Sequence, residues 1–387
     1  MDFIRDYLND LTAAGLYRKM HTVARREGCH IQVGDRQLVS FASNDYLGLS
    51  QHPEVVEASA EGARADGAGT GASRLIQGNF RYHEELEEKI ARFCNAEAAL
   101  LFPTGYMANV GVIASLIDDD DVIISDELNH ASIIDGCRLS GATVSVYPHK
   151  DLAALEQALE EYALSPRRLI VTESLFSMDG DIAPLREIVR MAEKHGALTM
   201  VDDAHAIGIL GEGRRGGLEL TGVEGRVNFL VGTLSKALGV LGGFAAGKKE
   251  FIDFLVNRAR SFIYTTALPA PVCAAASKAI DIISRDPEPS KRLWDNVRRF
   301  KAGLKDAGIS PFCEETHIIP IIVGGNEDAL SAASYLYEEG FFVPAIRPPT
   351  VPEGGARLRI TLTAMHTFEE IDSLVAALKK VPGDRCR

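Results

Sequence analysis

Short apolar runs alternate with helical patterns over most of the chain, and this alternation constrains the fold more than any other feature. From about residue 45 onward, the runs are AALLF near 98, DVIISD near 121, TVSVYP near 143, RLIVTES near 168, LTMVDDA near 198, VNFLVG near 227 and GGFAAG near 242. Strands separated by helical segments are typical of βαβ units. The pattern predicts an α/β fold with a mostly parallel sheet and helices on both faces.

Two changes in the sequence pattern divide the chain into three parts. Residues 1 to about 28 are expected to form a helix, because apolar side chains recur there at spacings of three and four: Phe3, Ile4, Tyr7, Leu8 and Leu11. The proline-rich segment DPEPS, residues 286–290, is a boundary signal before a second set of helices and strands. We therefore predict an N-terminal helical arm (1–44), a large domain (45–285) and a smaller C-terminal α/β domain (286–387).

Charge and composition exclude several classes of partner. The 387 residues carry a formal net charge of −13, whereas nucleic acids and anionic membranes attract clustered Lys and Arg. No apolar run approaches the roughly 18 residues of a spanning helix. The start, MDFIRDYLNDL, is acidic and unlike a secretory signal. We expect a soluble cytoplasmic protein that binds neither nucleic acid nor membrane.

The six cysteines are scattered and include no CxxC pair, so neither a zinc knuckle nor a disulfide framework is indicated. Free thiols in a reducing compartment are the simplest interpretation.

One lysine occupies an unusual position. Lys236 lies in GTLSKALG, a small, polar segment with glycine at both ends, and three nearby glycines disfavour a helix after it. Upstream, Asp202 and His205 follow an apolar run, beyond the end of an expected strand, where open α/β sheets bind ligands. A lysine amine can form a Schiff base with an aldehyde, and a buried carboxylate can keep a pyridine ring protonated. This pair predicts pyridoxal 5'-phosphate chemistry.

Two further segments suit the same cofactor. FPTGYMAN has the pattern of a strand, a turn and a helix, which would direct the backbone amides of Gly105 and Tyr106 toward an anion. His130 follows another strand and could stack on a pyridine ring. Taken alone, each segment also has an ordinary structural interpretation: a strand-to-helix turn and a hydrogen-bonded histidine.

Several motifs resemble other sites incompletely. Gly67–Arg74 is glycine-rich but lacks nucleotide-binding spacing, and Gly242–Lys249 has lysine where a P-loop needs a hydroxyl. HEELE at His83 lacks the second histidine of a zinc helix. Asp118–Asp121 is expected to form a solvated turn. We therefore predict no metal and no nucleotide.

Arginines gather near the C-terminus, in IRPPTVPEGGARLRITLTAMH. Arg357 and Arg359 share one face of an expected strand, because side chains alternate with a period of two. Both could bind one carboxylate bidentately, or both could face water. Without further information, an arginine is more often solvated than bound to a ligand, so the solvated interpretation is favoured.

The ordered motifs resemble the α-oxoamine synthases over nearly the whole chain. The segments that carry the resemblance are SNDYLGLS, the glycine loop ending in Ser73 and Arg74, DELNHASIIDGCRLS, TESLFSMDGDIAPL, VDDAHAIG, GTLSKALG and IRPPTVPEGGARLRITLTAMH. RPPTVP is most similar to the biotin-pathway member of that family. The resemblance implies the aminotransferase-like (type I) pyridoxal phosphate fold and a homodimer with shared active sites.

The resemblance also implies roles for individual residues. Lys236 would bind the cofactor aldehyde, Asp202 would pair with the pyridine nitrogen, and His130 would stack on the ring. The remaining cofactor contacts would be His205 and Ser177 near the 3-oxygen, with Thr233, Gly105, Tyr106 and, from the neighbouring subunit, Thr266 near the phosphate. Asn44 and Arg359 would bind the amino-acid carboxylate, and Arg18 and Thr350 the acyl donor or product.

The implied reaction joins L-alanine to a pimeloyl thioester, carried by coenzyme A or an acyl carrier protein, and releases carbon dioxide to give 8-amino-7-oxononanoate. Sister activities that use glycine, namely glycine C-acetyltransferase or 5-aminolevulinate synthase, remain alternatives, although Ser73 mildly favours alanine over the aminolevulinate reaction. A non-catalytic regulator on the same fold is the alternative of a different class, but no DNA-binding segment is visible.

Overall fold

The computed structural model describes residues 2–313 and 316–381. The chain forms two compact units that we describe separately. Unit 1 comprises Met1–Gly48, Ser177–Asp181 and Glu288–Arg387, and unit 2 comprises Leu49–Phe176 and Ile182–Pro287. The predicted arm thus shares unit 1 with most of the predicted small domain, and the predicted large domain corresponds mainly to unit 2.

Unit 2 is built on a sheet of seven strands among its described residues, in the order β4-β10-β9-β8-β7-β5-β6. The strands are β4 (Ala98–Phe102), β5 (Val122–Asp126), β6 (Thr143–Tyr147), β7 (Arg168–Glu173), β8 (Leu198–Asp202), β9 (Phe229–Thr233) and β10 (Gly243–Gly247). Neighbouring strands from β6 to β9 run parallel, and β10 runs antiparallel to both β9 and β4. Every predicted strand is present, and the prediction of a mostly parallel sheet is confirmed.

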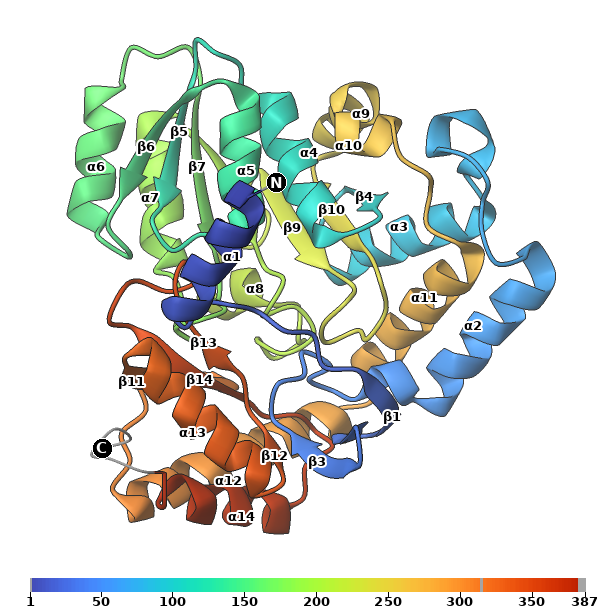
Figure 1. Cartoon of the computed structure of the whole chain (residues 1–387). Helices are drawn as coiled ribbons and strands as arrows, with labels where there is room; N and C mark the ends of the chain where they lie inside the picture. Colours follow the sequence, from blue (N-terminus) through green and yellow to red (C-terminus); the bar gives the residue numbers. More distant parts are fainter. Residues whose placement is uncertain (1, 314–315, 382–387) are drawn as a thin grey trace. The chain divides into compact units, whose positions relative to one another are not determined.

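Helices cover both faces of this sheet (Figure 1). They are α2 (Pro53–Asp66), α3 (Arg81–Phe93), α4 (Gly105–Leu116), α5 (Ala131–Ser140), α6 (Leu152–Glu161), α7 (Leu185–His195), α8 (Gly217–Thr221), α9 (Lys249–Arg258), α10 (Arg260–Ile263) and α11 (Ala270–Arg285). Short helical turns occupy Leu49–Gln51 and Arg74–Gly78. In the core, Ile113 of α4 and Ile133 of α5 pack with Val171 and Val231 of the central strands. Burial of such side chains stabilises the unit by about 1.5–3 kcal/mol each.

Unit 1 contains two small sheets. The first has the order β1-β2-β3-β12, and the second has the order β11-β14-β13. Its elements are α1 (Asp2–Ala13), β1 (Val23–Glu27), β2 (His30–Val33), β3 (Arg36–Ser40), α12 (Glu288–Ala307), β11 (Ile318–Gly324), α13 (Asn326–Glu338), β12 (Phe341–Phe342), β13 (Ala345–Ile346), β14 (Ala356–Thr361) and α14 (Phe368–Leu378). The first sheet joins both ends of the chain, because β12 pairs with β3.

The predicted N-terminal helix is correct only in its first half. Helix α1 ends at Ala13, and residues 23–27 form a strand paired with β2. Gly15 has a φ of +65°, a conformation that glycine adopts without strain and that ends helices. The remaining segment lacks the helical spacing of apolar side chains, so strand pairing decides its structure. A helix over all of residues 1–28 was therefore wrong.

No helix among the described residues is both long enough and apolar enough to cross a bilayer.

His366, after β14, is a buried histidine held in its neutral form. Its ring stacks on Phe41 with centroids 4.1 Å apart. Nδ1 accepts the Thr363 N–H at 3.0 Å, and Nε2 lies 3.0 Å from the Ser40 carbonyl oxygen, to which it donates in this tautomer. Burial lowers the pKa of His366 to about 4. Protonation would therefore oppose folding.

We predict that unit 1 loses stability as the pH falls from about 6.5 to about 4. The unfolded chain binds a proton at His366 in this window while the folded chain does not, which costs up to about 3 kcal/mol. Denaturant unfolding followed by the fluorescence of Trp294, the single tryptophan, measures this loss. The advantage of the parent over His366→Gln should shrink across the window. A constant difference from His366→Gln would contradict the prediction.

Candidate active site

The parallel strands of unit 2 end together and bring several polar side chains to one edge. Glu173, the last residue of β7, pairs in register with Asp202, the last residue of β8. Asp202 in turn pairs with Val231, two residues before Thr233 ends β9. The carboxyl edge of such a sheet is where α/β proteins bind ligands. The motifs that contain Asp202 and Lys236 therefore belong to one edge.

Asp202 is buried, with 6% of its surface exposed. Its Oδ2 accepts a hydrogen bond of 2.6 Å from Nδ2 of Asn109, and its Oδ1 accepts the Ala204 N–H at 2.9 Å. Both donors are neutral, so they orient the carboxylate without neutralising its charge. A buried carboxylate is stabilised by a cationic partner, and a protonated pyridine nitrogen is a partner of that kind.

Asn109 is a site residue that the sequence interpretation missed. It lies on α4, and its Nδ2 also donates to the Ser132 hydroxyl at 2.9 Å. Its Oδ1 is buried and has no hydrogen-bond partner among the described residues. The FPTGYMAN motif contains Asn109. The only signal in the sequence was its position four residues after Gly105, which places both residues on the same face of α4.

His130 stands at the start of α5. Its backbone N–H donates to Oε1 of Glu173 at 2.7 Å, and its Nδ1 accepts the Ser132 N–H at 3.2 Å. The residue remains accessible to solvent. Protein atoms packed around the imidazole nevertheless lower the pKa of His130; the negative charge of Asp202 opposes this shift, and the positive charge of Lys236 adds to it.

Glu173 is the second residue that sequence reasoning missed. Burial raises its pKa well above the usual carboxyl value, and the charge of Asp202 raises it further. The charge of Lys236 and the hydrogen bond from His130 act in the opposite direction. A protonated Glu173 still accepts the His130 N–H, so it fixes the start of α5 without adding a second negative charge beside Asp202.

Lys236 lies in a segment of bends and turns after β9, as predicted, and is half-buried. Its charge influences both His130 and Glu173, which places its amine in the same electrostatic neighbourhood as Asp202. His205 is buried in the turns that follow β8. Unit 2 thus brings Lys236 and Asp202 within electrostatic reach of His130 and Glu173.

The N-terminus of α4 provides an anion-binding end for this edge. Thr104 caps the helix by accepting the Met107 N–H at 3.1 Å. The first amides of a helix, here Gly105 and Tyr106, have no partner within the helix. Thr233 lies beside them, since a Cβ at Gly105 would be 3.3 Å from the Thr233 Cβ. Backbone donors and a helix dipole together favour a phosphate.

Three other predicted cofactor residues have local surroundings of their own. The Tyr106 hydroxyl donates to Asp135, so its side chain has a local partner. Thr266 is exposed in the loop after α10. Ser177 belongs to unit 1, where its carbonyl oxygen accepts a 2.6 Å hydrogen bond from Nε of Arg359.

Unit 1 holds the residues predicted to bind the substrates. Nη1 of Arg359 donates to Oδ1 of Asn44 at 3.4 Å and to the Thr361 hydroxyl at 3.0 Å. Arg18 and Thr350 both line a small cavity of about 80 Å³. The structure therefore groups Asn44 with Arg359, and Arg18 with Thr350.

The solvated interpretation of the strand arginines was wrong. Arg357 and Arg359 are only 3% and 4% exposed. Arg357 forms an ion pair of 2.8 Å with Asp179 and donates to the Met178 carbonyl oxygen at 3.1 Å. Segment 177–181 thus supplies acceptors for both guanidinium groups, which lets them lie inside unit 1.

The incomplete motifs have structural roles. His83 contacts backbone groups, its Nε2 lying 2.8 Å from the Leu268 carbonyl oxygen. The glycine loop ends in Arg74, whose two terminal nitrogens donate to Glu87 at 2.8 and 2.9 Å. Gly243–Gly247 is a strand, which a P-loop would not be. The turn after Asp118 is not wholly solvated, because Asp121 is buried and pairs with Arg167 at 2.7 Å.

Comparison with known proteins identifies the family of this chain. The model of the family "Aminotransferase class I and II" matches residues 36–378. The chain belongs to this family. Within it, the chain is 47% identical to the 8-amino-7-oxononanoate synthase of Thermoanaerobacter pseudethanolicus over 382 residues, covering 98% of this chain and 97% of that protein. It is 44% identical to 8-amino-7-oxononanoate synthase 1 of Bacillus subtilis, with coverage of 98% and 97%.

Solved structures give the same assignment. Serine palmitoyltransferase from S. paucimobilis, solved with a pyridoxal phosphate adduct, is 31% identical with a TM-score of 0.93, covering 98% of this chain and 96% of that one. The 8-amino-7-oxononanoate synthase of Francisella tularensis is 27% identical with a TM-score of 0.77, covering 89% and 97%. The prediction of an α-oxoamine synthase with the aminotransferase-like (type I) fold is confirmed.

We predict that Gly243→Ala destabilises unit 2 and disturbs the start of α4. A Cβ at Gly243 would lie 2.4 Å from the backbone nitrogen of Gly105 and 2.5 Å from the carbonyl carbon of Thr104. Such overpacking against backbone costs about 1–3 kcal/mol. Denaturant unfolding followed by circular dichroism measures the loss. Gly69→Ala is the matched control, because no heavy atom lies within 4 Å of its added Cβ; equal midpoints for the two variants would refute the close approach.

Proposed function

We propose that the chain condenses L-alanine with a pimeloyl thioester, on coenzyme A or an acyl carrier protein, releasing carbon dioxide and the free thiol and giving 8-amino-7-oxononanoate, an intermediate of biotin. The observation that carries the proposal is nearly full-length identity of 44–47% to several 8-amino-7-oxononanoate synthases. Asp202 and Lys236, whose charges both act on His130 and Glu173, would supply the chemistry that this reaction needs.

The residues at the sheet edge fit pyridoxal 5'-phosphate. Asp202 would hold the pyridine nitrogen, His130 would lie against the ring, and the amides of Gly105 and Tyr106, with Thr233, would hold the phosphate. His205, Ser177 and, from a second subunit, Thr266 complete the proposed contacts. When bound, this cofactor withdraws electrons from the substrate Cα, so that the Cα proton becomes acidic.

Lys236 is proposed both to anchor the cofactor and to move the proton at the alanine Cα. When it is free, its amine would act as the base for that proton. A positioned base contributes about 10² to 10⁴ in rate. Lys236 later returns a proton to the same carbon after carbon dioxide has left.

Asp202 would keep the pyridine nitrogen of the bound cofactor protonated, and Asn109 holds Asp202 in position. The 2.6 Å hydrogen bond from Asn109 and the 2.9 Å bond from Ala204 fix both carboxylate oxygens. Protein dipoles that are already oriented need no rearrangement as charge develops in the substrate. Asn109 is therefore a positioning residue for the proposed catalytic Asp202.

Arg359 and Asn44 are proposed to bind the carboxylate of alanine. The buried guanidinium is fixed by Ser177, Thr361 and Asn44, so it can present its planar fork without losing side-chain freedom on binding. Arg18 and Thr350, which line one cavity, are proposed to contact the acyl donor.

We further propose a homodimer with shared active sites. The five described free cysteines are compatible with a reducing cytoplasm.

The sister reactions differ from this one in both substrates, so a single assay separates them. Purified protein loaded with pyridoxal phosphate is offered alanine, glycine or serine, each with pimeloyl, acetyl, succinyl or palmitoyl thioester. Turnover restricted to alanine with the pimeloyl donor supports the proposal. Preference for another pair replaces it with that sister activity, and no turnover with any pair would favour the regulator.

We predict that Lys236→Ala lowers turnover by at least about 10²-fold, because the base is lost together with the cofactor anchor. A readout independent of activity is borohydride reduction of the cofactor-loaded parent followed by peptide mapping, which should find the reduced adduct at position 236. Lys248→Ala, an exposed lysine of the same unit, should keep both activity and adduct. An adduct elsewhere would remove Lys236 from its proposed role.

We predict that Asp202→Asn slows exchange of the alanine Cα proton with solvent deuterium, measured by NMR without any acyl donor. Breaking a buried charge pair costs about 3 to 5 kcal/mol, and here the ring would lose its proton instead. Asn109→Asp serves as a companion variant, because it replaces the neutral donor to Asp202 with a second carboxylate and should also slow exchange. Exchange at the parent rate in Asp202→Asn would refute the electrostatic role.

A further inference from the structure

Three side chains that can bind a metal ion meet in unit 1, where β1 turns into β2. Cys29 precedes β2, His30 begins it, and Glu370 lies in the first turn of α14. Each contributes one ligand atom, and the sulfur, the ring nitrogen and the carboxylate oxygen all lie within 4.8 Å of one another. Cys29 and Glu370 are 341 positions apart in the sequence. A short motif cannot indicate such a cluster, so the sequence prediction of no metal could not take it into account.

The carboxylate of Glu370 already contacts both of the other side chains. Its Oε1 lies 2.7 Å from Nε2 of His30, and its Oε2 lies 3.7 Å from the sulfur of Cys29. The same sulfur lies 4.0 Å from Nδ1 of His30. In a tetrahedral zinc site, bonds of about 2.0 to 2.3 Å place neighbouring ligand atoms about 3.4 to 3.6 Å apart. Small adjustments of the side chains would therefore make room for an ion between them.

The burial and charge of the cluster suit a divalent cation that enters from solvent. Cys29 is buried, Glu370 is half-buried and His30 is exposed. Without an ion, burial and the negative charge of Glu370 raise the pKa of Cys29 to about 12, so the sulfur keeps its proton. A divalent cation would replace that proton, which would leave to solvent. One thiolate and one carboxylate would then balance its charge.

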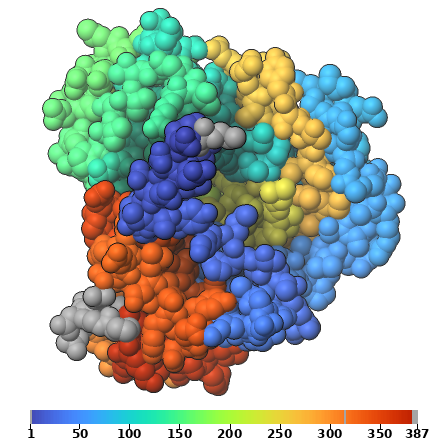
Figure 2. Space-filling view, in the orientation of Figure 1, coloured from blue at the N-terminus to red at the C-terminus, as the bar shows by residue number. Residues whose placement is uncertain are grey.

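The cluster joins the two ends of the chain. In Figure 2 the N-terminal segment, in blue, lies beside the C-terminal segment, in orange and red. Glu370 is fixed at the start of α14, because it forms a capping box with Thr367 and accepts the Thr367 N–H at 2.8 Å. A metal ion that closes so long a loop restricts the unfolded chain and stabilises the folded one.

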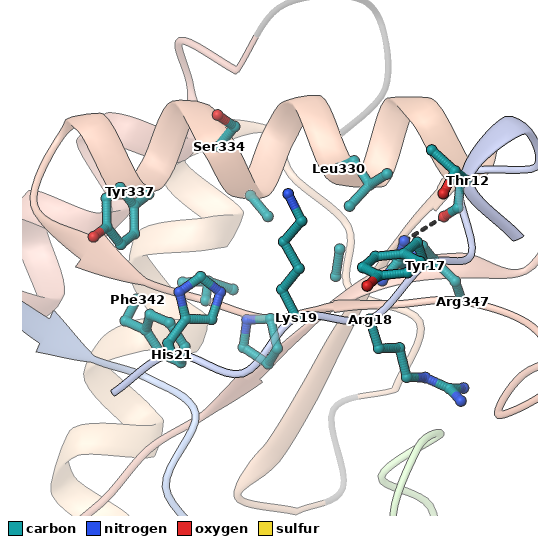
Figure 3. A pocket seen from close by; sticks show the side chains of 15 residues that line it. Thr12, Tyr17, Arg18, Lys19, His21, Leu330, Ser334, Tyr337, Phe342 and Arg347 are labelled. Carbon is teal, nitrogen blue, oxygen red and sulfur yellow. Dashed lines mark hydrogen bonds between the residues drawn. The ribbon is translucent and has the colours of Figure 1, made fainter. Parts of the chain in front are cut away.

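This cluster is separate from the site residues and cavities of unit 1. It contains none of the residues assigned above to the cofactor or the substrates. Unit 1 also has a cavity of about 650 Å³ between the segment after α1, helix α13 and residues 342–347 (Figure 3). Neither this cavity nor the small one beside Thr350 is lined by Cys29, His30 or Glu370. A ligand at the cluster would therefore leave the proposed reaction untouched.

We propose that Cys29, His30 and Glu370 bind one Zn²⁺ ion, with water in the fourth position, and that this ion links the turn before β2 to helix α14. Thiolate, imidazole and carboxylate are zinc ligands in proteins, and three protein ligands leave one position of a tetrahedral site for water. The inference goes beyond the proposed function, because it concerns the stability of unit 1.

The first test measures zinc binding to the full chain with pyridoxal phosphate bound, after removal of metal by a chelator and with the thiols reduced. Equilibrium dialysis should find one Zn²⁺ per chain at this cluster. Glu370→Gln should weaken that binding at least about tenfold, since even an indirect partner of a metal typically contributes 10- to 100-fold. Glutamine can still form the capping box, so this variant should fold.

Two matched controls accompany the variants. Glu369→Gln changes the neighbouring, exposed carboxylate of the same helical turn, which lies outside the cluster. Cys29→Ser should also weaken zinc binding at least about tenfold, whereas Cys313→Ser, at a half-buried cysteine of unit 1, is its control. Both controls should bind zinc like the parent. Equal zinc affinity of the parent, Glu370→Gln and Cys29→Ser would overturn the inference, as would absence of stoichiometric zinc in the parent.

The second test measures the link between the two segments. Zinc should raise the denaturant midpoint of the parent, followed by the fluorescence of Trp294 in α12, because the ion binds only the folded cluster. Glu370→Gln should show no such shift, and Glu369→Gln should show the shift of the parent. Zinc binding that leaves the midpoint of the parent unchanged would refute the proposed link. Neither test depends on turnover, so failure of the proposed function would not affect the result.

Discussion

The parallel pairing of β7, β8 and β9 is the constraint on which the site of unit 2 depends. Because neighbouring strands end at one edge, Glu173, Asp202 and Thr233 come together although they are far apart in sequence. A shift of the register by one residue would turn each of these side chains to the opposite face of the sheet. Apolar residues such as Val171 and Val231 oppose that shift, because it would remove them from the core in which they pack with Ile113 and Ile133. The hydrophobic core therefore positions the chemistry.

Burial gives the polar groups of this edge their distinct properties. Asp202 and Glu173 are neighbouring buried carboxyl groups, but they have different partners. Asp202 accepts two hydrogen bonds from neutral donors, whereas Glu173 accepts the His130 N–H and has its pKa raised by burial. Two adjacent carboxylates would repel each other strongly. The raised pKa favours the protonated form of Glu173, which reduces the repulsion between Glu173 and Asp202.

Much of this arrangement could be predicted from the sequence, for a physical reason. Strands alternating with helices have few stable arrangements, and in these the segment after each strand reaches one edge. Asp202, His205 and Lys236 could therefore be placed from their motifs. Asn109 and Glu173 could not, because their roles depend on which side chain meets which after packing. The N-terminal segment was misjudged because pairing with β2, a contact outside the local pattern, makes residues 23–27 a strand.

The strand arginines show why an alternating pattern alone cannot decide burial. The period of two places Arg357 and Arg359 on one face of β14, but whether that face is buried depends on acceptors supplied from elsewhere. Segment 177–181 supplies them, through the carboxylate of Asp179 and the carbonyl oxygens of Ser177 and Met178. Removing an arginine from water without such acceptors would cost several kcal/mol. Segment 177–181 is distant in sequence from the C-terminal part of unit 1, residues 288–387, in which the arginines lie. It nevertheless allows unit 1 to hold a fixed, buried guanidinium. This is the group best shaped to recognise a carboxylate.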